Sequence, residues 1–186
     1  MAAAQPRPCR LDWGRSDWGR SDWGRSYWGW HPLRPEWADR VVTDAPVRPG
    51  DVVVDLGAGD GALTLPLARL GCRVLAVELH PRRATVLRER FEGTRVAVVE
   101  LDVASFCWPG HPFRVVANPP YAGINALVRR LLAAPRLRSA DLVVAERAAR
   151  GLVSRCGDRL ELGPRVPRAA FVNRPPGDAR VIRIRR

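Results

Sequence analysis

The sequence predicts an α/β domain built on a doubly wound, mostly parallel sheet with an antiparallel hairpin near its C-terminal end. From Val52 onward, short apolar runs alternate with helical stretches, as they do when crossover helices join parallel strands. The last two apolar runs, 166–171 and 179–184, have a Pro-Pro-Gly turn but no helix between them. Such a pair predicts a hairpin added to one edge of the sheet.

The expected elements follow in a regular order. An amphipathic helix over 36–45 comes first, and Pro49-Gly50 separates it from the first strand. The expected parallel strands are 52–56, 73–77, 95–101, 113–117 and 141–145, and the expected helices are 62–70, 81–91, 122–134 and 146–153.

A five-residue repeat, Asp-Trp-Gly-Arg-Ser, fills 12–26. Its period matches neither a helix nor a strand, so we expect a disordered tail over 1–27 and one folded domain over 28–186. The Trp and Arg side chains of the tail could form a weak RNA-binding arm. The alternative is a repeat expanded by replication slippage.

The composition indicates one domain and a partner rich in phosphate. A chain of 186 residues with 46% hydrophobic residues can bury one proper core. The formal net charge is +12, and all 31 basic residues are arginine. A GC-rich coding bias explains the choice of arginine, whereas the excess of charge favours a polyanion whose binding weakens with salt.

The 4 cysteines lack the spacing of metal ligands, so we expect no metal and reduced, mostly buried thiols in a cytoplasmic protein. No apolar run reaches the ~18 residues of a membrane span, and the amino terminus shows no signal-peptide core.

Polar or glycine residues follow four of the expected strands. A glycine-rich turn that includes Gly57 and Gly59 follows the first strand, Glu78 ends the second, Asp102 ends the third and Asn118 follows the fourth. Each has an ordinary explanation by itself: Glu78 could be a surface carboxylate, and Asp102 could cap the turn after it. Together they predict one ligand site at the carboxyl ends of the strands, with Glu78 placed to bind a ribose diol.

The segment Asn118-Pro-Pro-Tyr121 suits a flat substrate that carries an exocyclic amine. The Asn118 side-chain oxygen and the Pro119 carbonyl could each accept one amine hydrogen, which turns the nitrogen lone pair outward. Tyr121 could stack on the ring. The two prolines stiffen the loop. An NAD-dependent enzyme would explain the first two strand ends but has no use for this loop.

These motifs, with Trp28-Gly-Trp-His-Pro-Leu33 and Val166-Pro-Arg-Ala-Ala-Phe171, resemble the erythromycin-resistance (Erm) family of 23S rRNA adenine N6-methyltransferases. The resemblance is to compact actinobacterial members that lack the C-terminal helical domain. It implies a Rossmann-like class I methyltransferase fold, S-adenosyl-L-methionine as cofactor, and resistance to macrolides, lincosamides and streptogramin B. It also implies 23S rRNA or an assembling large ribosomal subunit as partner of a monomeric enzyme.

The resemblance also implies roles for single residues. His31, Leu33, Gly57, Gly59, Glu78, Asp102 and Asn118 would bind the cofactor, His31 and Leu33 on its methionine side. Asn118, Pro119, Tyr121 and Phe171 would form the catalytic site, in which Tyr121 and Phe171 clamp a flipped adenine. The sequence departs from the family pattern at Trp30 and Pro32.

Two questions stay open from sequence. Recognition of rRNA is expected on the arginine-rich later half, at Arg129, Arg130, Arg136, Arg138, Arg147, Arg150, Arg155, Arg159 and Arg168, although these could form an ordinary solvated surface. A methyltransferase of DNA adenine or protein glutamine, and an inactive RNA-binding relative, remain alternatives.

Overall fold

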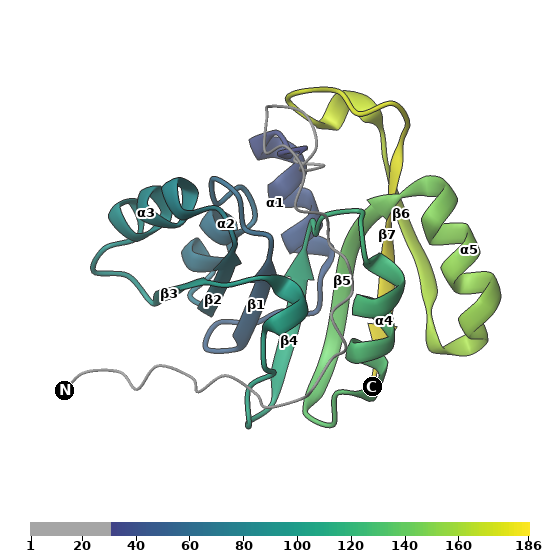
Figure 1. Cartoon of the computed structure of the whole chain (residues 1–186), viewed down its shortest axis with the longest axis horizontal. Coiled ribbons are helices and arrows are strands. Elements are labelled where there is room, and N and C mark those ends of the chain that lie inside the picture. The colour runs from purple at the N-terminus through teal and green to yellow at the C-terminus, as the bar shows by residue number, and fades with distance from the viewer. Residues whose placement is uncertain (1–30) are drawn as a thin grey trace.

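The computed structural model describes residues 31–186, which form one seven-stranded sheet with helices on both faces (Figure 1). The boundary expected at residue 28 and the repeat over 12–26 lie outside the described residues. The strands are β1 Val52–Leu56, β2 Arg73–Glu78, β3 Val96–Glu100, β4 Phe113–Ala117, β5 Leu137–Ala145, β6 Glu161–Val166 and β7 Ala179–Arg185. The helices are α1 Pro35–Asp44, α2 Thr64–Arg69, α3 Pro81–Arg90, α4 Ile124–Ala133 and α5 Glu146–Cys156. Short 3-10 turns are η1 Val103–Ser105, η2 Gly157–Arg159 and η3 Arg168–Ala170.

The order of strands in the sheet is β3-β2-β1-β4-β5-β7-β6. Strands β1 to β5 pair in parallel, and β7 pairs antiparallel with both β5 and β6. The predicted doubly wound sheet with an antiparallel hairpin is therefore confirmed. The chain builds outward from β1 to β3 and then returns to the other side of β1 with β4. Ligands of such sheets bind at this switch point, beyond the carboxyl ends of β1 and β4.

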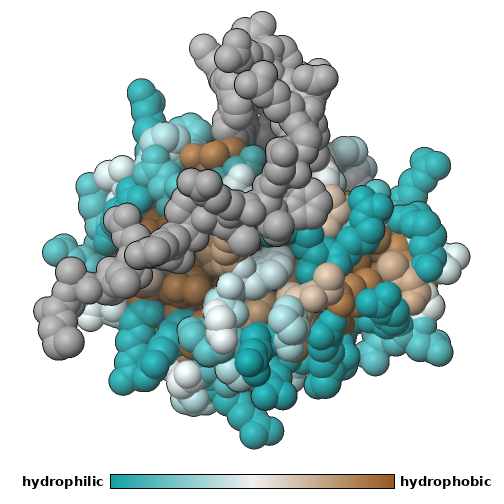
Figure 2. All heavy atoms as spheres, turned by 60° about the horizontal axis from the view of Figure 1, so that its bottom comes forward, coloured by the Kyte–Doolittle hydropathy of each residue, from teal (hydrophilic) through white to brown (hydrophobic). Residues whose placement is uncertain are grey.

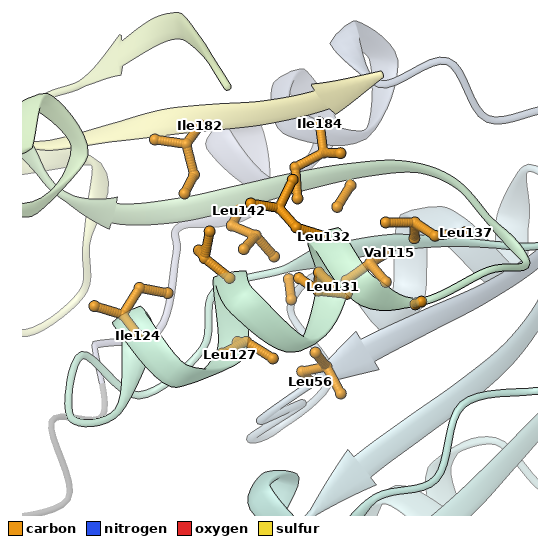
Figure 3. Packing of buried hydrophobic residues seen from close by; sticks show 14 of the residues in the cluster. Leu56, Val115, Ile124, Leu127, Leu131, Leu132, Leu137, Leu142, Ile182 and Ile184 are labelled. Carbon is orange, nitrogen blue, oxygen red and sulfur yellow. The ribbon is translucent and has the colours of Figure 1, made fainter. Parts of the chain in front are cut away.

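The core has two layers because neighbouring side chains of each strand point to opposite faces. Val54 and Leu56 of β1 face α4 and α5, whereas Val53 faces α1 and α2. Helix α4 buries five residues at positions i, i+3, i+4, i+7 and i+8. These residues are Ile124, Leu127, Val128, Leu131 and Leu132. They belong to one buried cluster with residues of the sheet, and Figure 3 shows Leu131 and Leu132 close to Leu142 of β5. The start of α4 follows directly from the Asn118-Pro-Pro-Tyr121 loop, so this packing anchors that loop.

The predicted strand over 166–171 is wrong in its position. Strand β6 ends at Val166, and the chain then makes the η3 turn before Phe171. Pro164 lies within β6, which is possible because β6 is an edge strand whose outer side needs no N–H donor. The sequence signal was misread because Gly163-Pro164 suggests a loop.

Buried charge fastens the hairpin to the parallel sheet. The Asp141 carboxylate of β5 is buried, and both terminal nitrogens of Arg185 on β7 donate to it at 2.9 and 2.8 Å. Arg183 Nε donates to the same carboxylate at 3.2 Å. Charge-assisted, two-pronged pairs of this kind fix geometry as well as energy.

Charged and polar side chains cover much of the described surface in the view of Figure 2. Among residues 31–186, no helix is long and apolar enough to cross a membrane. Of the cysteines in this part of the chain, Cys72 is buried while Cys107 and Cys156 are half-buried, so the expectation of mostly buried thiols is met at one position.

Candidate functional site at the switch point of the sheet

The turn after β1 and the loop after β4 touch each other. Gly57 has a φ of +73°, and a Cβ atom built there would lie 2.9 Å from Pro120 Cδ. A side chain at this position would therefore collide with a rigid proline ring. Gly57 also donates its N–H to the Val77 carbonyl at 2.8 Å. The lack of a side chain at Gly57 brings the two predicted ligand loops together.

The Asn118 side chain has a fixed orientation. Its Nδ2 donates to the backbone carbonyl of His31 at 2.8 Å. A carbonyl can only accept, so this contact establishes which end of the amide is the nitrogen. Among the residues that the structure describes, no group donates to Asn118 Oδ1. The amide thus keeps its acceptor end for another partner.

Three aromatic rings stand in a row beside Asn118. The His31 ring centroid is 5.9 Å from that of Tyr121 and 6.4 Å from that of Phe171, which it meets edge to face. Tyr121 is half-buried and Phe171 is fully buried. Burial raises the pKa of the Tyr121 phenol to about 12, so this side chain stays neutral at physiological pH. Phe171 is fully buried and packs in the same core cluster as Leu33, Val166 and Ala170.

Backbone pairing joins the first motif to the late aromatic motif. Leu33 and Phe171 form an antiparallel bridge, flanked by the bonds Arg34 N to Ala170 O at 2.8 Å and Val172 N to Pro32 O at 2.9 Å. Leu33 is buried, and its neighbour His31 has Nδ1 3.0 Å from Asn173 Oδ1. The structure therefore places His31 next to Tyr121 and Asn118, and its role on the methionine side of a cofactor stays a prediction.

The Glu78 carboxylate ends β2 in a buried position. Its Oε2 accepts from the Gly59 N–H and its Oε1 accepts from the His80 N–H, both at 2.8 Å. The two N–H groups fix the carboxylate at the strand end. Each oxygen retains a second lone pair, which could accept from the hydroxyls of a ribose.

Asp102 lies beside this strand end. The Leu101 N–H donates to the Glu78 carbonyl at 3.1 Å, and Asp102 Oδ1 accepts from the Ala104 N–H at 2.8 Å. Asp102 therefore caps the η1 turn, as the ordinary interpretation of the sequence proposed. Its side chain is exposed, so this capping bond does not exclude a role in binding a ligand.

A pocket opens between these elements. It is lined by residues that come from the first motif, from the turn after β1 and from the β4 loop: Pro32, Leu33, Asp55, Gly57, Ala58, Asp60, Ala62, Leu63 and Asn118. The buried Asp55 carboxylate accepts from Thr64 Oγ1 at 2.7 Å. Burial raises the pKa of Asp55 to about 7, and the charge of Glu78 adds to this effect.

Comparison with known proteins shows the family. The family model for ribosomal RNA adenine dimethylase matches residues 33–185. The chain belongs to the ribosomal RNA adenine dimethylase family. The resemblance seen in the sequence motifs is thereby confirmed.

Individual relatives agree with this family. An rRNA methyltransferase of Streptomyces thermotolerans is 37% identical over 164 residues, which are 81% of this chain and 55% of the relative. An rRNA adenine N-6-methyltransferase of Corynebacterium diphtheriae is 32% identical over 145 residues, 72% of this chain and 57% of the relative. The chain thus spans little more than half the length of these curated relatives.

Among solved structures, the 23S rRNA methyltransferase ErmE has a TM-score of 0.76 at 31% identity, covering 83% of this chain and 69% of its own. A dimethyladenosine transferase from Plasmodium falciparum has a TM-score of 0.72 at 23% identity, covering 83% of this chain and 62% of its own, and supports the fold alone. The predicted methyltransferase fold is confirmed by these similarities.

Two features of the site were missed from sequence. The contact between Gly57 and Pro120 and the bond from Asn118 to His31 join segments far apart in the chain, and no local pattern reveals such contacts. Within residues 31–186, no three His, Cys, Asp or Glu side chains gather as a metal site would require.

Proposed function

We propose that the protein transfers a methyl group from S-adenosyl-L-methionine to N6 of an adenine in 23S rRNA. The observation that carries this proposal is the orientation of the Asn118 amide. Its nitrogen is engaged by the backbone carbonyl of His31, which leaves Oδ1 as an acceptor, and the His31 ring in turn lies 5.9 Å from the Tyr121 ring. An amine bound there would donate one hydrogen to Oδ1 and one to the Pro119 carbonyl.

This arrangement answers the main chemical difficulty of the reaction. The lone pair of an adenine amine is delocalised into the ring and is a poor nucleophile. Two acceptors that hold the amine hydrogens favour a pyramidal nitrogen whose lone pair points outward. Tyr121, neutral because of its high pKa, supplies a stacking surface instead of a base. The nitrogen loses its proton after transfer, so no strong general base is required.

The pocket, which Asp55 and Gly57 line, and the strand ends that carry Gly59, Glu78 and Asp102 fit the cofactor. S-adenosyl-L-methionine supplies an electrophilic methyl group when bound. Glu78 would accept from the ribose hydroxyls, because its carboxylate is held in place by two N–H groups. Gly57 and Gly59 would allow a ligand to lie against the backbone, and Asp102 would accept from the adenine amino group. The anionic Asp55 form would favour the positively charged methionine portion.

The base-binding side is formed by Tyr121 and His31. Because Phe171 is fully buried and meets the His31 ring edge to face, its proposed role is to support that ring, and a direct contact with the base would need Phe171 to become exposed. An adenine inside an RNA stack cannot reach this site, so the target base would be flipped out.

The proposed partner is 23S rRNA, alone or in an assembling large subunit, which places the enzyme in the cytoplasm. The net charge of +12 supports a polyanionic substrate. Of the nine arginines considered for recognition, all except Arg130 are exposed. Methylation of this rRNA would confer resistance to macrolides, lincosamides and streptogramin B.

A substrate panel tests the proposal. The protein is incubated with S-adenosyl-L-methionine that carries a tritiated methyl group, together with unmodified 23S rRNA, total DNA or a release factor. We expect label in 23S rRNA. Label in DNA would favour a DNA adenine methyltransferase, and label in the release factor would favour a protein glutamine methyltransferase. Cofactor binding without transfer would favour an inactive RNA-binding relative.

A further inference from the structure

Arg130 is set apart from the neighbouring arginine on helix α4. Adjacent helical residues point about 100° apart, and Arg129 is exposed whereas Arg130 is half-buried beside the apolar face. Recognition of RNA by both residues was an expectation from sequence. The contacts of Arg130 show a structural engagement that Arg129 lacks among the described residues.

The Arg130 guanidinium spans the η1 turn. Its NH1 donates to the Val103 carbonyl at 2.7 Å, and its NH2 donates to the Phe106 carbonyl. Val103 is the first residue of the turn, and Phe106 ends it. One rigid, forked cation therefore holds both ends of the turn, and a lysine could not reproduce this geometry.

An aromatic cluster supports the same turn. The Arg130 guanidinium carbon lies 4.9 Å from the centre of the Trp108 ring. Trp108 stacks on Phe113 with centroids 5.6 Å apart and meets Phe106 edge to face at 5.7 Å. Because Phe113 begins β4, the turn is locked to the sheet and to α4 together.

The turn held by Arg130 is the one that Asp102 caps. Asp102 Oδ1 accepts from the Ala104 N–H, within the span between the two carbonyls that Arg130 holds. Helix α4 in turn begins just after the Asn118-Pro-Pro-Tyr121 loop. We propose that Arg130 is a positioning residue that fixes the Asp102 turn for the adenine end of the cofactor and couples that turn to the target-amine loop.

This inference rests on the proposed function, because it uses the cofactor site assigned there. It assigns Arg130 no contact with cofactor or RNA. If the η1 turn opens when the two hydrogen bonds from Arg130 are lost, only a fraction of the molecules holds Asp102 in place. The apparent dissociation constant of the cofactor then rises by the inverse of that fraction.

The test compares Arg130→Met with Arg130→Lys and Arg129→Met in the full chain. The dissociation constant of S-adenosylhomocysteine is measured by calorimetry without RNA, RNA affinity by filter binding, and protection of 103–107 by amide hydrogen exchange. We expect Arg130→Met to weaken cofactor-product binding about tenfold and to raise exchange in 103–107, with Arg130→Lys intermediate. Arg129→Met should retain that affinity and weaken only the binding of RNA.

A general loss of stability is excluded with Val128→Ala, which removes buried volume from the same helix. When the two variants are compared under conditions where both have lost the same free energy of unfolding, Val128→Ala should keep its affinity for S-adenosylhomocysteine. The inference is overturned if Arg130→Met binds within twofold of the unaltered protein, or if Val128→Ala loses affinity equally. Failure of the unaltered protein to bind S-adenosylhomocysteine would instead contradict the proposed function and, with it, this inference.

Discussion

Replacement of Gly57 by alanine should damage both stability and activity. The residue has a φ of +73°, a conformation that costs an L-residue about 1–2 kcal/mol. The added Cβ would lie 2.9 Å from Pro120 Cδ, and overpacking of this kind costs about 1–3 kcal/mol. We therefore expect a total loss of about 2–5 kcal/mol in the free energy of unfolding, together with displacement of the loop that carries Asn118.

Gly50→Ala is the matched control. Gly50 has a φ of +87° but nothing within 4 Å of the position of a Cβ, so this variant meets the backbone strain without the collision. Urea unfolding of both variants isolates the cost of the collision, because the two variants share the backbone strain. Each kcal/mol lost from the free energy of unfolding also lowers the melting temperature by about 2–4 °C in a domain of this size. Methyl transfer, assayed well below both melting temperatures, should fall in Gly57→Ala and persist in Gly50→Ala. Equal stability and equal activity of the two variants would refute the importance of the contact between Gly57 and Pro120 for stability and methyl transfer.

Three further substitutions, one of them with a control at an exposed ion pair, test the charged groups. Burial raises the pKa of Asp55 to about 7 from 3.8, so the folded protein holds a proton that the unfolded chain releases, and stability should decline as pH rises from about 4 to about 7. Asp55→Asn should make the free energy of unfolding, measured with urea, decline less over this pH range. An unchanged pH dependence would contradict the raised pKa of Asp55. Asp141→Asn should lower the free energy of unfolding by about 3 kcal/mol, because it leaves Arg183 and Arg185 without their buried partner. Glu100→Gln, which breaks an exposed ion pair, should lower it by less than about 1 kcal/mol. Similar losses in the two variants would contradict a stabilising role of the buried Asp141 cluster. Glu78→Gln should weaken the binding of S-adenosylhomocysteine about tenfold or more, because the NH₂ group of the new amide would face one of the two backbone N–H donors. An unaltered affinity in calorimetry would contradict a role of Glu78 in the cofactor site.

Much of the fold was predictable because its signals are local. Continuous apolar runs predicted β1 and β4 with their observed bounds, and the i, i+3, i+4 spacing predicted α4. Strand β5 begins at Leu137, earlier than the expected residue 141, because residues from Leu137 on already pair with β4. In this added part, the buried Ser139 accepts a hydrogen bond from Arg114 NH1. A polar residue satisfied by a distant side chain has no signature in the local pattern.

The candidate site was predictable in part for the same reason. Carboxyl ends of parallel strands share one edge, so the glycine turn, Glu78, Asp102 and Asn118 could be placed together from their positions alone. The place of His31 between Tyr121 and Phe171 could not, since it depends on backbone pairing between segments that lie far apart in the chain. Arg130 was grouped with surface arginines because charge patterns do not reveal which guanidinium turns toward backbone carbonyls.

The most direct test of the central claim is the identity of the methylated nucleoside. Unmodified 23S rRNA is treated with the protein and tritiated S-adenosyl-L-methionine, digested to nucleosides and separated with mass detection. We predict that the label appears in N6-methylated adenosine, and that Asn118→Ala, shown to be folded by circular dichroism, abolishes it. Label in any other nucleoside, or undiminished label with Asn118→Ala, would contradict the assignment of this loop as the adenine N6 site.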